Sequence, residues 1–204
     1  MTLIEEAKKK TAKSVSISVL DALCDRRAVR HYTAKAVDEK TVRTLLEFAV
    51  QAPSAVNSQP WSFAIVQKPD LLKEISDGAK KTMAQDPRWK SEAKHLPNRF
   101  LDPAFNIFYG ASTLIIVCAT QEGLVPEADC YLACQNLMLA AYGMGLGTCP
   151  IGLAWDILRT DSMKQKLGIP VGHFPVLPII VGYPSETTSR TPRNPPRILN
   201  WIGV

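Results

Sequence analysis

The segment from Thr113 to Ala119 most strongly constrains the fold of this chain. Its sequence, TLIIVCA, is a continuous apolar run of strand length that is rich in β-branched residues. Such a run indicates a β-strand buried on both faces, so that other elements must cover the sheet from two sides. A second apolar run, from Val176 to Gly182, predicts another strand, in which Pro178 leaves one backbone donor missing.

Two helices and a strand are predicted before this central strand. Residues 16–24 carry apolar side chains at helical spacing, although alternation at the start of the segment also allows a strand. Asp38 is a suitable N-cap for the next helix, which keeps its apolar side chains on one face and ends before Pro53. Residues 62–66 then form a short predicted strand.

The longest predicted helix runs from Pro126 to Met144 and is apolar almost all round. A helix of this kind must be buried nearly completely, and a second subunit could supply part of the cover. Further helices are predicted from about Asp70 and over residues 154–167, the latter ended by Gly168. Because helices and strands do not alternate as βαβ units, the pattern indicates an α+β fold.

The composition limits the broad class of protein. The chain has 204 residues, 46% hydrophobic and 21% charged, which suits one folded domain over residues 16–204. We expect residues 1–15 to form an N-terminal helical extension or tail. No apolar run is long enough for a membrane span and the N-terminus has no secretory signal, so a cytoplasmic protein is expected. The five cysteines lack zinc-ligand spacing, which favours free thiols over a metal site.

The basic balance of the chain favours anionic ligands. The formal net charge is +5, but Lys and Arg are spread along the sequence and no nucleic-acid-binding motif is present. Nucleic acid is therefore not an expected partner, and neither is a membrane.

Three arginines, Arg26, Arg27 and Arg30, lie within five residues. Guanidinium groups stay charged and donate paired hydrogen bonds to phosphate, so their convergence would suit a phosphomonoester. An isolated cluster of this kind is more often a solvated basic patch. Three later pieces favour the phosphate interpretation: PSAVNSQPW from Pro53, GLGTCPIG ending at Gly152, and a Gly-Tyr-Pro followed by two arginines.

In this order, the four pieces resemble the nitroreductase family of FMN-dependent oxidoreductases. The resemblance covers the chain from about Ser16 to its C-terminus, and P-S-A-x-N-x-Q-P-W is its most specific part. It implies a nitroreductase-like fold, with a central mixed β-sheet flanked by helices, in an intertwined homodimer with the flavin at the interface. It also implies that NADH or NADPH reduces FMN, which then reduces a nitroaromatic, quinone or related acceptor in a ping-pong scheme.

The resemblance assigns the arginine cluster to the two ends of the cofactor. Arg26 corresponds to the phosphate-binding arginine, and Arg27 contributes at least its backbone. Ala28 stands where the family usually has Ser, so other donors must replace that hydroxyl. Arg30 corresponds to a cation beside the pyrimidine edge of the flavin, where positive charge stabilises the reduced ring. The alternative for Arg30 is an ion pair with an acid such as Asp25.

The remaining candidate cofactor-binding residues lie in three later segments. The resemblance places the loop of Pro53, Ser54, Ala55 and Asn57 against the flavin of the partner subunit, although an ordinary helix-ending turn would use the same residue types. It places Pro150, Ile151 and Gly152 behind the flavin, with a backbone N–H near Gly152 directed at N5; many family members have Glu there. Asn106 could bind the amide edge of the ring, and Arg190 and Arg193 could complete the phosphate site.

No catalytic side chain is predicted, because the flavin would carry the chemistry. The absence of a Ser/His/Asp set or a carboxylate pair from the sequence agrees with this. Three alternatives remain open: reductive dehalogenation, flavin fragmentation, and a flavin-binding protein without turnover. Residues 86–110, which we expect to include an excursion over the site, would decide between the reactions. The physiological substrate, the choice of NADH or NADPH and the oxygen sensitivity do not follow from the sequence.

Overall fold

The computed structural model describes residues 3–5, 17–85, 87, 102 and 104–203. Its centre is a four-stranded sheet in the order β1-β2-β4-β3, in which every neighbouring pair is antiparallel. The strands are β1 (Trp61–Val66), β2 (Thr113–Ala119), β3 (Gly147–Pro150) and β4 (Phe174–Gly182). Every residue of β2 is buried, as predicted for a strand covered on both faces. The α+β class is confirmed.

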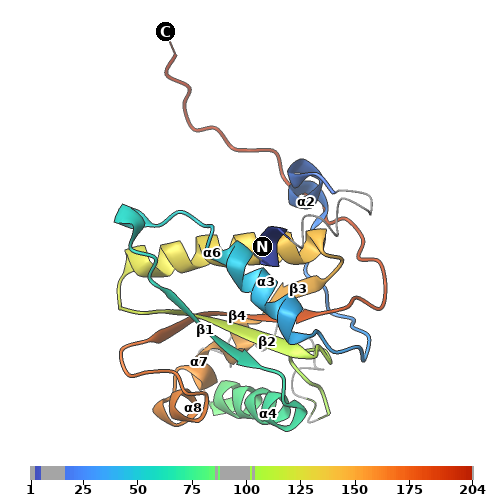
Figure 1. Cartoon of the computed structure of the whole chain (residues 1–204), viewed down its shortest axis with the longest axis vertical. Coiled ribbons are helices and arrows are strands. Elements are labelled where there is room, and N and C mark those ends of the chain that lie inside the picture. Colours follow the sequence, from blue (N-terminus) through green and yellow to red (C-terminus); the bar gives the residue numbers. More distant parts are fainter. Residues whose placement is uncertain (1–2, 6–16, 86, 88–101, 103, 204) are drawn as a thin grey trace.

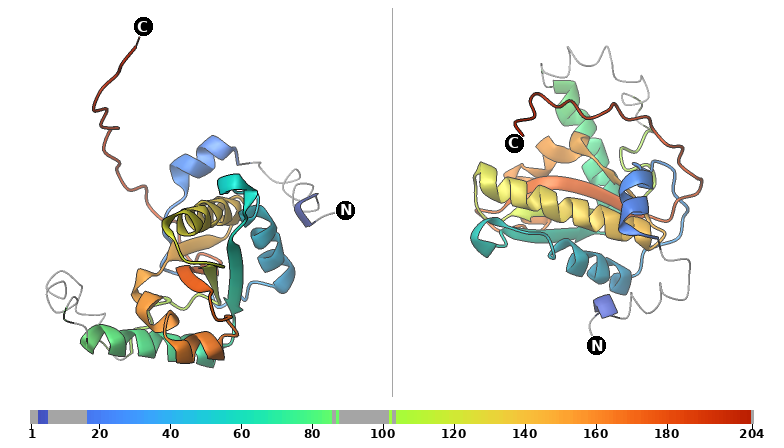
Figure 2. Two further views of the ribbon diagram at one scale, coloured as in Figure 1. Left: turned by 90° about the vertical axis from the view of Figure 1, so that its left-hand side faces the viewer. Right: turned by 90° about the horizontal axis from the view of Figure 1, so that it is seen from above.

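Helices form a layer on each face of this sheet (Figures 1 and 2). One layer contains α3 (Glu39–Ala49) and α6 (Leu124–Gly143), and the other contains α4 (Pro69–Gln85), α7 (Trp155–Leu158) and α8 (Asp161–Lys166). Side chains of β2 alternate between the two cores, because successive residues of a strand point to opposite faces. The resemblance implies a mixed sheet. In the structure, the parallel pairing seen among the described residues is an isolated bridge between Ala28 and Thr148 of β3.

The helix predicted after Asp38 is confirmed as α3. The Asp38 carboxylate accepts the Thr41 N–H at 2.8 Å, which satisfies one of the free donors at the start of the helix. Leu45 and Ala49 are fully buried between α3, α6 and the sheet. The local N-cap signal and the apolar spacing therefore agree with the tertiary packing here.

The first predicted helix is present as α2 (Val19–Asp25), capped by Ser18. Its apolar residues are not buried within the chain, because Ala22 is its only buried residue and Leu20 is 72% exposed. Likewise α6 was expected to be buried nearly all round, yet Tyr131 and Leu132 are 40% and 46% exposed. These apolar surfaces have no partner within the described part of the chain.

The prediction of one helix over residues 154–167 is wrong. The segment divides into η3 (Gly152–Ala154), α7 and α8, because the Thr160 hydroxyl accepts the Met163 N–H and caps a new helix. The strand β3 was also missed, since the segment after the Gly-rich end of the long helix was assigned no secondary structure. A strand this short shows no alternation that periodicity could detect.

The tail from Pro184 has little regular structure and extends away from the body beside α2 (Figure 1). Its last residues are apolar and exposed, including Leu199 and Trp201 at 90% and 80%. Most of the N-terminal extension, and most of residues 86–103, where the excursion over the site is expected, lie outside the described residues. Among the residues that are described, no helix is long and apolar enough to cross a membrane.

Candidate cofactor site

The arginine segment lies along the free edge of β3. The Val29 N–H donates to the Thr148 carbonyl at 2.9 Å, and the Thr33 N–H donates to the Tyr183 carbonyl at 2.9 Å. These hydrogen bonds, with the bridge between Ala28 and Thr148, attach residues 28–33 to the end of the sheet. The three arginines are thereby placed beside the segment that leads to Gly152.

Two glycines allow this close approach. A Cβ added at Gly147 would lie 2.7 Å from the Val29 side chain, and one added at Gly182 would lie 2.7 Å from the Tyr32 ring. Neither glycine has a positive φ, so each is needed for space and not for backbone conformation. Sequence patterns did not indicate this role, because it depends on which residue each glycine faces in the folded chain.

Arg26 lies in a concentration of positive charge. Burial, followed by the neighbouring charges of Arg27 and Arg193, lowers the pKa of Arg26 from its usual value. The guanidinium remains protonated near neutral pH, because an arginine pKa normally lies above 12. Arg193, from the other end of the sequence, thus adds to the positive charge felt at Arg26.

Arg27 and Arg190 are engaged by other groups. Arg27 Nη1 donates to the carbonyls of Cys24 and Arg26 at 2.8 and 2.7 Å, so its side chain folds onto the end of α2. Arg190 Nη2 lies 2.5 Å from Asp25 Oδ1. Asp25, the acid considered as a partner for Arg30, thus pairs with the tail instead.

A cavity of about 840 Å³ lies between the end of α2, the end of α6 and the start of the tail. Its lining combines cations and hydroxyl groups, and includes Arg26, Arg27, Arg190, Thr148, Ser185, Thr187, Thr188 and Ser189. Two carboxylates also line it, Asp25 and Glu186, and they pair with Arg190 and His31. Hydroxyls and guanidinium groups are both donors to an anion. The cavity therefore has the chemistry of a site for the phosphate end of a ligand.

Arg30 is exposed and has no ion pair within the described part of the chain. Its guanidinium carbon lies 6.0 Å from the centroid of the Tyr109 ring, at the outer limit of a cation–π contact. Burial raises the pKa of the Cys149 thiol in β3, against the opposing effects of nearby Arg30 and Arg26. Arg26 and Arg30 flank Ala28 and Val29, which pair with Thr148 of β3, and Arg30 lies on the side of Tyr109.

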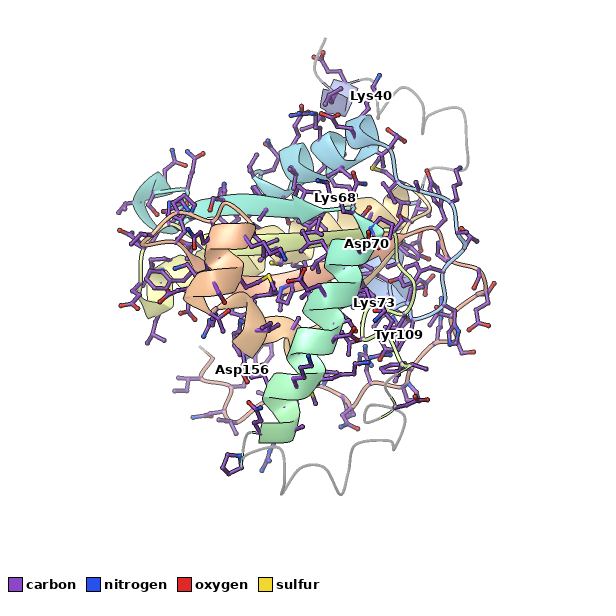
Figure 3. All side chains as sticks on the ribbon, turned by 90° about the horizontal axis from the view of Figure 1, so that it is seen from below. Lys40, Lys68, Asp70, Lys73, Tyr109 and Asp156 are labelled. Atoms are coloured by element: carbon purple, nitrogen blue, oxygen red, sulfur yellow. The ribbon has the colours of Figure 1, made fainter. Side chains whose placement is uncertain are left out.

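Asn106 shapes the turn that carries Tyr109. Its Oδ1 accepts the Phe108 N–H at 2.8 Å, and its carbonyl accepts the Tyr109 N–H at 2.9 Å. Tyr109 has a φ of 54°, uncommon for a residue other than glycine, and its ring packs edge-on against Phe105. Figure 3 shows Tyr109 beside α4, on the opposite side of that helix from Asp156. The Asn106 amide oxygen therefore accepts a hydrogen bond within the turn, and no bond of its amino group is seen in the described part of the chain.

Pro150, Ile151 and Gly152 connect β3 to η3. The Ile151 N–H donates to the Pro178 carbonyl at 2.9 Å, which fixes the end of the strand against β4. Gly152 is exposed and begins η3, so its N–H has no partner inside that helix. A Cβ at Gly152 would meet nothing within 4 Å, so the space beside this position is open.

The loop from Pro53 to Asn57 is not an ordinary helix-ending turn. It contains η1 (Ala55–Asn57), and three residues in and after it have positive φ: Val56, Asn57 and Gln59 at 48°, 55° and 47°. Val56 is 99% exposed. The loop contacts the start of α6, whereas Tyr142 near the end of α6 lines the cavity beside Arg26, so the two sites are roughly 20 Å apart along the helix.

Comparisons with known proteins identify the family. The family model described as the nitroreductase family matches residues 23–183. The chain belongs to the nitroreductase family. A nitroreductase from Bacteroides fragilis NCTC 9343, solved with bound FMN, is 26% identical with a TM-score of 0.76, over 91% of this chain and 98% of that one.

Two curated relatives differ in the reactions that their names give. A Bacillus subtilis protein named FMN reductase (NAD(P)H) is 26% identical, over 89% of this chain and 72% of its own length. A Rhodospirillum rubrum protein named 5,6-dimethylbenzimidazole synthase is 30% identical, over 82% of each chain. The nitroreductase fold is confirmed, and so is the prediction of an FMN-dependent NAD(P)H oxidoreductase. The exact reaction remains a matter of proposal.

Proposed function

We propose that this nitroreductase passes reducing equivalents from NAD(P)H to a nitroaromatic, quinone or related acceptor, with FMN held at the arginine segment. The observation that carries the proposal is the cavity of about 840 Å³ that Arg26 and Arg27 line together with the hydroxyls of Thr148 and Ser185. Guanidinium groups and hydroxyls that face one cavity can all donate hydrogen bonds to a phosphate bound there. When bound, the flavin supplies the redox chemistry, accepting a hydride and passing electrons to the acceptor.

The residues present fit this cofactor at both of its ends. Arg26 and Arg193 would hold the phosphate. Thr148 and Ser185 line the same cavity, and their hydroxyls would replace the hydroxyl that is missing at Ala28. Thr148 is well placed for this, because it is the residue that bridges Ala28.

At the ring end, Arg30 would place positive charge beside the pyrimidine edge, and the Gly152 N–H would donate to N5. A positioned donor or cation stabilises negative charge that develops on the ring during reduction. Pro150 and Ile151 would lie against one face of the ring. Asn106 and Arg190 are less available to bind the flavin, since Asn106 accepts a hydrogen bond in its own turn and Arg190 pairs with Asp25. The open position at Gly152 would leave room for the nicotinamide or the acceptor.

A single preparation tests the function. We expect the purified protein to release FMN, identified by mass spectrometry, and to lose its yellow colour when NADH or NADPH is added anaerobically. A nitroaromatic and a quinone should restore the colour over repeated turnovers, because the oxidised cofactor is regenerated. A yellow protein that neither nucleotide bleaches would instead be a flavin carrier.

The same preparation separates the other reactions of the fold. An iodinated phenol that restores the colour while iodide is released would indicate reductive dehalogenation. Destruction of the flavin on exposure of the reduced protein to air would indicate flavin fragmentation. Either result in the absence of nitroaromatic and quinone turnover would contradict the proposed acceptor class.

We further propose a two-fold homodimer with a flavin at each end of its interface. The Pro53–Asn57 loop and the arginine cavity lie at opposite ends of α6, so one chain cannot close both around the same ring. A two-fold axis across α6 would bring the loop of one copy to the arginines of the other. The exposed apolar residues of α2, α6 and the tail supply surface for such a contact.

The assembly is tested by Leu132→Asp, which places a charge on the exposed side of α6. We expect wild-type protein to be a dimer by light scattering, and the variant to shift towards monomer and lose bound FMN, because a buried unpaired carboxylate is strongly unfavourable. Val171→Asp is the matched control, since Val171 is fully exposed in the loop before β4. A wild-type monomer that binds FMN tightly would refute the proposed assembly.

A further inference from the structure

Asp129 is a buried carboxylate in an otherwise apolar part of α6. It is 6% exposed, and the helix carries no charged side chain from Cys130 to its end. Burying a carboxylate is unfavourable unless hydrogen bonds compensate for the lost water. Its two oxygens lie 3.3 and 3.2 Å from the Ala55 nitrogen, and they accept that N–H across 74 residues of sequence.

The loop that contains Ala55 needs such a restraint. Val56, Asn57 and Gln59 all have left-handed backbone, and a β-branched residue such as Val56 rarely adopts it. Conformations of this kind persist only where the surroundings hold them, and they concentrate at ligand-binding sites. Within the loop, the Ser54 hydroxyl accepts the Gln59 N–H, and the Gln59 side chain donates to the Asn57 amide oxygen.

Two neighbouring residues of α6 attach this loop to the body of the protein. Asp129 holds Ala55, and the Cys130 thiol donates weakly to the Pro60 carbonyl at 3.6 Å. The carboxylate forms the stronger attachment, because a hydrogen bond to an ionised acceptor is about twice as strong as a neutral one. It also reaches the loop at its first helical residue, directly before the three strained positions.

We propose that Asp129 is a positioning residue of the flavin site. Its carboxylate holds the Pro53–Asn57 loop in the strained conformation that presents Ala55 and Asn57 to the ring of a flavin bound mainly by a second copy. The proposal rests on the proposed function for its flavin, but the attachment of the loop can be measured without flavin. Asp129 would touch neither cofactor nor substrate.

The test compares Asp129→Ala with Asp129→Asn and with Leu137→Ala. Leu137 is fully buried in the same helix and faces the core, so its truncation lowers stability without touching the loop. The measurements are hydrogen exchange at the Ala55 amide in flavin-free protein, dissociation constants of FMN and riboflavin, and the melting temperature.

We expect Asp129→Ala to remove the exchange protection at Ala55 and to weaken FMN and riboflavin by the same factor, of roughly tenfold or more. Equal factors are expected because the loop acts at the ring, which both flavins share. Asp129→Asn keeps an oxygen that can accept the Ala55 N–H and should recover most of the protection and affinity. Leu137→Ala should lower the melting temperature while the flavin affinities measured well below it stay close to wild type.

Should Asp129→Ala fail to fold, Ala55→Pro removes the same hydrogen bond from the loop side. Proline is tolerated at the first residue of a helix, and Ser54 before it already has an extended backbone. Flavin affinities of Ala55→Pro should then fall together, as for Asp129→Ala. Unchanged affinities in this variant would overturn the proposal.

The outcomes also separate this proposal from the proposed function. Unchanged Ala55 exchange in Asp129→Ala, or flavin affinities that fall no further than in Leu137→Ala, would overturn the positioning role. If wild-type protein binds neither flavin, the proposed function fails and with it the role at the flavin, while the exchange data still show whether Asp129 holds the loop.

Discussion

We expect Arg26→Ala to weaken FMN binding while leaving riboflavin binding nearly unchanged. Loss of one charge-assisted hydrogen bond to a phosphate costs about 1.5–3 kcal/mol, a ten- to hundredfold loss of affinity. Riboflavin lacks the phosphate, so it does not depend on this contact. Fluorescence titration of both ligands measures the two dissociation constants. Arg43→Ala is the matched control, because Arg43 is an exposed arginine of α3 paired with Glu39.

The companion variant Arg30→Ala should behave differently, because Arg30 is assigned to the ring. FMN and riboflavin should weaken by similar factors, and the potential of the remaining bound flavin should fall, since the reduced ring loses its nearest cation. A redox titration measures that potential. If Arg26→Ala weakens riboflavin as much as FMN, the phosphate assignment is wrong. If Arg30→Ala leaves the potential unchanged, Arg30 is not beside the ring.

Gly147→Ala is expected to disturb the whole arginine segment through one methyl group. The new Cβ would lie 2.7 Å from the Val29 side chain, so β3 and residues 28–33 must separate. Overpacking of this kind typically costs about 1–3 kcal/mol, and each kcal/mol lowers the melting temperature of a chain this long by about 2–4 °C. FMN and riboflavin should both bind more weakly, because the displaced segment carries Arg30 and directly follows Arg26 and Arg27.

The control for this variant is Gly143→Ala, near the end of α6, where an added Cβ meets nothing within 4 Å. Its backbone φ is not positive, so the substitution should leave the melting temperature and both flavin affinities near or above wild type. If Gly147→Ala melts and binds flavin like the wild type, residues 28–33 can move away from β3 without lowering stability or affinity, and their close packing against β3 is not required.

Features that depend on local signals were predicted correctly, whereas features that depend on hydrogen bonds or pairing formed in the folded chain were missed. Helix α3 and strand β2 were predicted correctly, because an N-cap at Asp38 and an unbroken apolar run are local signals. The division of residues 152–166 was missed, because periodicity continued across Thr160 while its hydroxyl capped a new helix. Strand β3 was missed because its identity depends on pairing with β4.

By itself, the sequence determined the α+β class, the family and the cofactor, since these depend on residue types in a fixed order. It also indicated which arginines to assign to a phosphate. Only the tertiary structure decided that Arg190 pairs with Asp25, that Gly147 must accommodate Val29, and that Asp129 holds Ala55. Each of these is a contact between residues far apart in the chain. Such contacts depend on how helices and strands pack together, which no local pattern of residues encodes.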